Sequence, residues 1–103
     1  MTTEAVLDTK TKKSLKKPKK YKVVFVNDDQ TPFEWVINIL INVFKHSEQS
    51  AINLTSKIHN EGSAIVGVYH FEIAEQKASE AQLLSRSHRF PLQIKLEEEW
   101  CLH

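Results

Sequence analysis

Three stretches of the chain have the apolar pattern of a strand. Residues 21–26, YKVVFV, are β-branched or aromatic except for one lysine, which is typical of a strand covered on both faces. Residues 63–71, SAIVGVYHF, predict a second strand, in which Gly67 indicates a bulge or the close approach of another backbone. In residues 92–97, LQIKLE, apolar and polar residues alternate, so the third strand should have one solvent-exposed face.

The segment TPFE predicts the start of a helix between the first two strands. Thr31 would be the N-cap, Pro32 the first helical residue and Glu34 the residue that closes a capping box. Nine of the twelve residues 33–44 are apolar, which is more than the single stripe that a surface helix needs. This helix is therefore either buried nearly all round or lines a groove.

Two further helices are predicted from their end residues and composition. Ser47 is the expected N-cap of the second helix, and Gly62 is its expected left-handed C-terminal residue. One face of this helix consists of Ala51, Leu54, Thr55 and Ile58. A third helix, rich in alanine, glutamate and leucine, is expected from about residue 72 to residue 87.

The order β-α-α-β-α-β predicts an α+β fold. We expect a compact two-layer sandwich in which three helices cover one face of a three-stranded antiparallel sheet. Residues 21–98 would form this core. Residues 1–20 would be a flexible lysine-rich N-terminal extension, because they lack aromatic residues and periodic apolar positions, and residues 99–103 would be a short tail.

The formal net charge of +1 conceals a strong asymmetry. Residues 1–22 carry eight lysines and two acids, whereas the remainder carries six basic and eleven acidic residues. A lysine arm can bind phosphates, so a small nucleic-acid-binding module is one alternative function. The acidic body and the absence of interleaved aromatic residues in the arm disfavour nucleic acid as a partner.

Composition also argues against several other classes of protein. The single cysteine, Cys101, excludes an internal disulfide and a cysteine-rich metal site. The five histidines have no metal-ligand spacing, so we expect no metal and no cofactor. No apolar run approaches the roughly 18 residues that span a bilayer, and no secretory signal is apparent. We therefore expect a cytoplasmic protein without a membrane partner.

Asp28, Asp29 and His59 are the residues that could carry chemistry. Paired carboxylates and an imidazole can act as general acids and bases, but adjacent acids between a strand and a helix are more often turn formers or caps. Since no nucleophile paired with a base is apparent, an enzyme is disfavoured. The remaining possibility is an acidic mouth above an apolar groove, which would suit a ligand with a cationic end and an apolar body.

Three segments give the chain a strong resemblance to a known family. YKVVFVNDDQTPFEWVINIL, KIHNEGSAIVGVYHFEIAEQKA and FPLQIKLE, within about residues 20–98, resemble the ClpS family. They include the motifs V-N-D-D-x-T-P and H-x-x-G-x-A-x-x-G. ClpS proteins are non-enzymatic adaptors that bring N-degron substrates to the ClpA or ClpC unfoldase and its protease ClpP. The resemblance implies recognition of an N-terminal Phe, Tyr, Trp or Leu.

The resemblance also implies roles for individual residues. The α-amino group of the ligand would be bound by Asn27, Asp28 and His59, and the same turn would be shaped by Asp29 and Thr31. The side-chain pocket would be lined by Phe33, Val36, Thr55, Ile58 and Leu92. Docking on the unfoldase would use Glu72 and Lys77, and the N-terminal extension would engage the unfoldase during substrate transfer.

Two residues depart from the family pattern in the expected pocket. The family often has methionine where this chain has Phe33 at the rim and Thr55 in the wall. A stiff ring and a small hydroxyl-bearing residue change the shape of the pocket while roughly balancing its volume, because methionine is an adaptable filler. We expect aromatic N-termini to remain ligands and leucine to be weakened.

Overall fold

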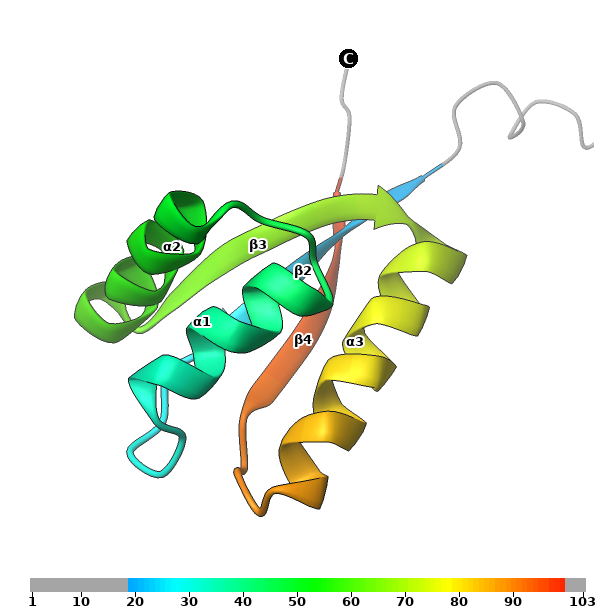
Figure 1. The fold of residues 1–103 in the computed structure, drawn as a ribbon. Coiled ribbons are helices and arrows are strands. Elements are labelled where there is room, and N and C mark those ends of the chain that lie inside the picture. Colours follow the sequence, from blue (N-terminus) through cyan, green and yellow to red (C-terminus); the bar gives the residue numbers. More distant parts are fainter. Residues whose placement is uncertain (1–18, 100–103) are drawn as a thin grey trace, which may run out of the picture.

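The computed structural model describes residues 19–99, which form a three-stranded antiparallel sheet and three helices. The strands are β2 (Lys20–Val26), β3 (Ser63–His70) and β4 (Gln93–Glu99), and the helices are α1 (Phe33–Asn42), α2 (Glu48–Glu61) and α3 (Phe71–Ser87). The helices lie together on one face of the sheet (Figure 1). The predicted α+β fold class is confirmed, whereas most of the predicted extension and of the C-terminal tail lies outside the described residues.

Strand β2 is the centre of the sheet, in the order β3-β2-β4. Val23 and Phe25 on one of its faces are fully buried in the core, and Val24 on the opposite face is only 5% exposed. The prediction of a well-covered strand is therefore confirmed. In β4, Ile94 and Leu96 pack against the core between exposed polar residues, which confirms the predicted solvent-exposed face.

Opposite charges align where β2 begins and β4 ends. Lys20 pairs with Glu99 and Lys22 with Glu97 in the antiparallel register. Lys19 Nζ lies 2.7 Å from Glu98 Oε2, and this interaction raises the pKa of Lys19. Cross-strand pairs of opposite charge favour one register over its neighbours, so these residues help to align the two strands.

The predicted irregularity in the second strand is a β-bulge. Val23 pairs with Gly67 and Val24 with Ile65, so Val66 is an extra residue on β3. The carbonyl oxygen of Val66 accepts a hydrogen bond from His46 Nε2 at 2.7 Å. The loop before α2 is thus joined to the backbone of β3 at the bulge.

The start of α1 differs from its prediction. The helix begins at Phe33, its N-cap is Pro32, and no side chain caps its first turn. The Pro32 carbonyl accepts from the N–H groups of Trp35 and Val36 at 3.1 and 3.3 Å. The prediction that Thr31 is the N-cap, with Glu34 closing a capping box, is wrong because the Thr31 hydroxyl donates to the Asp28 carboxylate instead.

Both predicted ends of α2 are confirmed. Ser47 Oγ accepts from the Ser50 N–H at 3.1 Å, and Gly62 has the left-handed φ of 94°. The Gly62 N–H then donates to the Ile58 carbonyl at 2.9 Å, which closes the last turn. Because a residue with a Cβ rarely adopts this φ, glycine ends the helix at a defined point.

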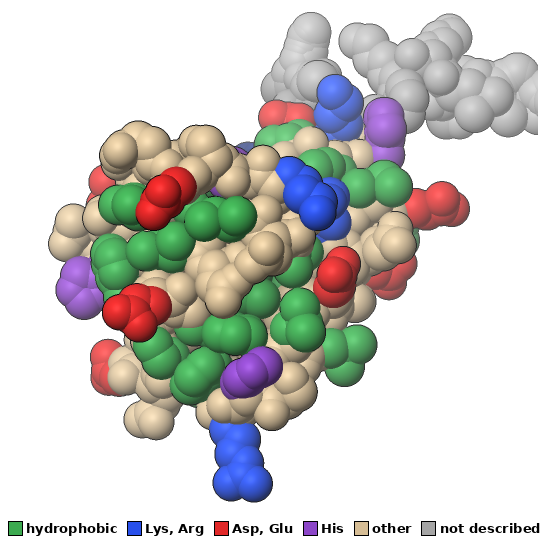
Figure 2. Space-filling model, in the orientation of Figure 1, with side chains coloured by type: hydrophobic (Ala, Val, Ile, Leu, Met, Phe, Trp, Pro, Cys, Tyr) green, Lys and Arg blue, Asp and Glu red, His purple; other side chains and the backbone are tan. Residues whose placement is uncertain are grey.

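The apolar excess of α1 has two explanations in the structure. Val36, Ile39 and Leu40 are buried in the core, whereas Phe33 at the first position is 43% exposed. Figure 2 shows apolar side chains spread over the surface of the helices, with acidic side chains scattered among them. One side of the helix is therefore buried in the core, its polar residues Glu34, Asn38 and Asn42 are exposed, and its first residue lies at a cavity.

Gly67 provides a test of packing at the bulge. A Cβ at this position would lie 2.5 Å from the Tyr69 hydroxyl oxygen and 2.6–2.7 Å from two ring carbons. The close approach predicted at this glycine is thus made by a side chain.

We expect Gly67→Ala to lower the free energy of unfolding by about 1–3 kcal/mol, measured by urea denaturation, because the ring must move. In a Tyr69→Leu background the same change should cost much less, and an equal cost there would contradict this explanation.

Candidate functional site

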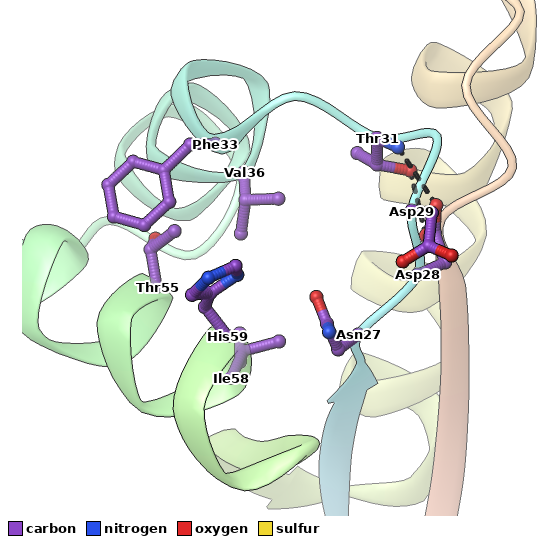
Figure 3. Close-up of a pocket in the computed structure, with 9 residues that line it drawn as sticks. All are labelled: Asn27, Asp28, Asp29, Thr31, Phe33, Val36, Thr55, Ile58 and His59. Carbon is purple, nitrogen blue, oxygen red and sulfur yellow. Dashed lines mark hydrogen bonds between the residues drawn. The ribbon is translucent and has the colours of Figure 1, made fainter.

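One backbone hydrogen bond brings the end of β2 to the end of α2. The Asn27 N–H donates to the Gly62 carbonyl at 2.9 Å, one residue after the strand ends. His59 lies in the last turn of α2, three residues before Gly62. The Asn27 and His59 side chains consequently extend into the same opening (Figure 3), although 31 residues separate them along the chain.

The Asp28 carboxylate organises the turn that follows. Its Oδ1 accepts from the N–H groups of Gln30 and Thr31 at 2.7 and 2.8 Å, and its Oδ2 accepts from Thr31 Oγ1 at 2.8 Å. The expected turn-forming role of this aspartate is therefore present. A carboxylate has about four acceptor positions, so Oδ2 retains capacity for one more donor.

Apolar groups from α1 and α2 form the other side of the opening. Val36 and Ile58 are buried, and Phe33 lies at the rim. Thr55 is only 3% exposed, and its hydroxyl donates to the Ala51 carbonyl at 2.7 Å. Because this hydroxyl is bonded within its own helix, Thr55 adds little polarity to the wall.

These groups line an open cavity of about 250 Å³. Its lining consists of Asn27, Asp28, Asp29, Thr31, Phe33, Val36, Thr55, Ile58 and His59. In Figure 3 the two aspartates lie at one end of this group and Phe33 and Thr55 at the other, so the cavity has an acidic end and an apolar end. The structure thus brings together nine of the ten residues that were predicted for the amine site and the side-chain pocket.

Leu92 is the exception. It is only 2% exposed, it belongs to the hydrophobic core, and it is not part of the cavity lining. Burial in the core does not exclude a role in the pocket, because Val36 and Ile58 belong to the same core cluster and line the cavity. That Leu92 lines the side-chain pocket therefore stays a prediction. Alternation in LQIKLE correctly indicated an inward side chain but could not distinguish core from pocket wall.

The chemistry available in the cavity favours binding of a cation. Carboxylate, amide and imidazole groups supply acceptors at one end, and the other end offers apolar surface. Within residues 19–99 there is no group of three or more His, Cys, Asp or Glu side chains that could hold a metal ion. None of the helices in that part of the chain is long and apolar enough to cross a membrane.

The two predicted docking residues lie on α3, on the far side of α1 from α2 (Figure 1). Glu72 is exposed in the first turn. Lys77 is half-buried, with its Nζ 3.0 Å from the Val43 carbonyl at the end of α1 and 5.6 Å from the centre of the Tyr69 ring. Burial raises the pKa of the Tyr69 hydroxyl. Lys77 therefore has a structural role within the domain, whatever it does at the surface.

Comparison with known proteins assigns this arrangement to a family. The model of the family described as ATP-dependent Clp protease adaptor protein ClpS matches residues 16–95. The chain belongs to the ClpS family. Among curated ClpS adapter proteins it is 49% identical to that of Nautilia profundicola over 81 residues, which are 79% of this chain and 84% of the relative. It is 38% identical to that of Maricaulis maris over 93 residues, which are 90% and 85% of the two chains.

A solved ClpS structure has the same fold. Agrobacterium tumefaciens ClpS2 bound to L-phenylalaninamide superimposes with a TM-score of 0.78 at 43% sequence identity, over 81% of this chain and all of the other. The recognised family and the fold expected from it are thus confirmed. The chain is accordingly an adaptor of the Clp protease, as its ClpS relatives are named.

Sequence reasoning missed the contacts that hold the ClpS site together. The hydrogen bond from Asn27 to Gly62 joins residues that are far apart in the chain, so no local sequence pattern predicts it. The Asp28 turn could have been predicted from the sequence, because an aspartate often accepts from N–H groups two and three residues later. The Thr-Pro pair drew attention to helix capping and obscured this possibility.

The Asp28 turn can be tested by stability. Asp28→Ala removes three acceptor interactions and should lower the free energy of unfolding by about 1–3 kcal/mol, because the Gln30 and Thr31 N–H groups lose their partner. Asp28→Asn keeps an oxygen for those groups and should cost less than about 1 kcal/mol. Urea denaturation of both variants measures the difference. Equal losses would show that the charge, rather than the turn geometry, is what stabilises the loop.

Proposed function

We propose that this ClpS protein binds proteins through a bulky apolar N-terminal residue and delivers them to a cytoplasmic Clp AAA+ unfoldase of the ClpA or ClpC type. The observation that carries the proposal is the cavity with an acidic end and an apolar end. Asn27, Asp28 and His59 would bind the α-amino group, and Phe33 with Val36, Thr55 and Ile58 would enclose the side chain. The protein would act by binding alone, without a cofactor or chemistry of its own.

The amine end of the proposed site suits a free N-terminus. An α-amino group has a pKa of about 8 and is mostly cationic at neutral pH. It has three donors, which match the free acceptor position of Asp28 Oδ2 together with the amide oxygen of Asn27 and a neutral imidazole nitrogen of His59. The nitrogen of an acetylated or internal residue is uncharged and has only one N–H donor.

The size of the cavity favours one side chain. Its volume of about 250 Å³ is below the roughly 300–1,000 Å³ of pockets for drug-sized ligands. Burying one Phe or Leu side chain contributes about 1.5–3 kcal/mol, and each charge-assisted hydrogen bond contributes a similar amount. After the cost of association, roughly micromolar affinity is expected, which permits release to the unfoldase.

The solved relative supports this ligand class. L-Phenylalaninamide, to which the Agrobacterium tumefaciens protein is bound, has a free α-amino group and a benzyl side chain. At 43% identity that protein is close enough to make the same ligand chemistry a reasonable proposal here. Phe33 and Thr55 adjust the preference, so that N-terminal Phe, Tyr and Trp are the proposed ligands and Leu is the weakest of the four.

A panel of labelled peptides that differ only in their first residue tests the proposal. Fluorescence anisotropy should give micromolar Kd values for Phe, Tyr and Trp, a weaker value for Leu and no saturable binding for Ala. Acetylation of the Phe peptide should weaken binding more than about 30-fold, because it removes the charge and at least two hydrogen bonds. Equal affinity for the free and acetylated peptides would refute the proposed amine site.

Two isosteric variants complete this experiment. Asp28→Asn removes one negative charge at the cavity and should weaken binding of the Phe peptide about tenfold. Glu97→Gln removes one from β4, outside the cavity, and is the matched control. Equal effects of the two changes would indicate attraction by overall charge only.

The proposed docking surface for the unfoldase is the exposed side of α3 around Glu72. Lys77 belongs to the same proposal, but its bond to the Val43 carbonyl means that any substitution also disturbs the end of α1. Glu72 is exposed and has no such bond in the described structure. Glu72 is therefore the better probe of docking.

Glu72→Lys should weaken association with a ClpA- or ClpC-type unfoldase at least about fivefold, because reversal of a charge at a complementary interface introduces repulsion. Surface plasmon resonance with immobilised unfoldase measures this change, and affinity for the Phe peptide should stay constant. Glu80→Lys makes the same change two turns further along α3, at another exposed position. An equal loss in both variants would argue against a specific contact at Glu72.

A further inference from the structure

Phe33 is exposed to an extent that packing alone does not explain. It is the first residue of α1, and 43% of its surface is accessible although its neighbours in the cavity wall are buried. Its ring stands nearly perpendicular to the His59 imidazole, at an angle of 84° with 6.4 Å between the ring centres. This distance and angle are those of an edge-to-face aromatic pair.

The Phe33 and His59 rings are both exposed, and they belong to different helices. Phe33 is in the first turn of α1, and His59 is in the last turn of α2. In Figure 3 the two rings lie near each other in the close-up, with Thr55 next to both. The contact therefore joins the rim of the apolar end of the cavity to a group at its polar end.

His59 contrasts with His46, whose ring is held at both nitrogens. His46 Nε2 contacts the Val66 carbonyl at 2.7 Å, and its Nδ1 contacts Ser50 Oγ at 3.1 Å. The His59 ring is exposed and has no hydrogen-bond partner among residues 19–99. Its contact is the aromatic one with Phe33. An exposed imidazole without such a contact would occupy several rotamers, and a ligand would have to select one of them.

We propose that Phe33 is a positioning residue for His59. Its ring holds the imidazole in an orientation that accepts a hydrogen bond from the ligand's α-amino group. Phe33 thus contributes to recognition of the amine as well as enclosing the side chain, so that the two ends of the cavity are coupled. This inference rests on the proposed function, in which His59 is an acceptor for that amine.

A cycle of two single variants and their double variant, measured with two ligands, separates positioning from simple wall contact. The variants are Phe33→Leu, His59→Ala and the double variant. The ligands are a peptide that begins with Phe and the same peptide with 3-phenylpropanoyl in place of Phe, which keeps the benzyl group but lacks the amine. Affinities for the first are measured by anisotropy and for the second by competition.

If Phe33 acts through His59, Phe33→Leu should weaken the amine-bearing peptide about two- to tenfold, which is the range expected for ordering one side chain. The peptide without the amine should lose less affinity, because Phe33→Leu changes only its contact with the cavity wall. In the His59→Ala background, Phe33→Leu should weaken the amine-bearing peptide only as much as it weakens the peptide without the amine, because coupled residues give non-additive losses. Phe33→Tyr retains the ring and should retain the affinity.

A spectroscopic measurement reports on the contact without a ligand. The His59 ring protons should shift in the NMR spectrum of Phe33→Leu, whereas Phe33→Tyr should leave them nearly unchanged. Additive losses, equal for both ligands, together with unchanged His59 resonances, would overturn the positioning role. If the wild-type protein bound both ligands equally, the proposed amine site itself would fail, and the NMR result would still decide whether Phe33 orders His59.

Discussion

The hydrogen bond from the Asn27 N–H to the Gly62 carbonyl is the constraint on which the cavity depends. It fixes the end of the central strand against the end of α2, at the point where a left-handed glycine terminates the helix. Asn27 and His59 become neighbours for this reason, and the turn that starts at Asp28 must begin there. A different helix end would displace the acceptor groups from one another even if every side chain were retained.

In the proposed function, Asp28 has two tasks: it forms a turn and it binds the ligand. Its carboxylate satisfies two backbone N–H groups and one hydroxyl, and thereby leads the chain from β2 to α1 without a side-chain cap on the helix. The same bonds hold the carboxylate in place, so the proposed cationic ligand would meet an acceptor that is already oriented. The alternatives of turn former and ligand-binding acid are therefore compatible in this position.

Much of the fold follows from local patterns, because its signals lie within single elements. Ser47 and Gly62 bound α2, and the β-branched run marks the central strand. The error at the start of α1 occurred because two groups compete for one partner: the Thr31 hydroxyl could cap the helix or bond to Asp28. The site residues came mainly from family resemblance, since no periodicity places Asn27 beside His59. The ring contact of Phe33 with His59 could not be predicted at all, because it depends on where α1 begins relative to the end of α2.

The size of the domain explains why the cavity is an open groove between helices. A chain of this length buries a small core, and Val23, Phe25 and Leu40 already fill it together with Leu92. A deep enclosed pocket would have to replace such residues and would destabilise the fold by several kcal/mol. The groove is instead lined by Phe33, which lies outside the core, and by Val36 and Ile58, which also pack in the core. The consequence is an open site of about 250 Å³. A site of this size matches the proposed ligand, one side chain with its amine, and the moderate affinity that would let an adaptor release its substrate.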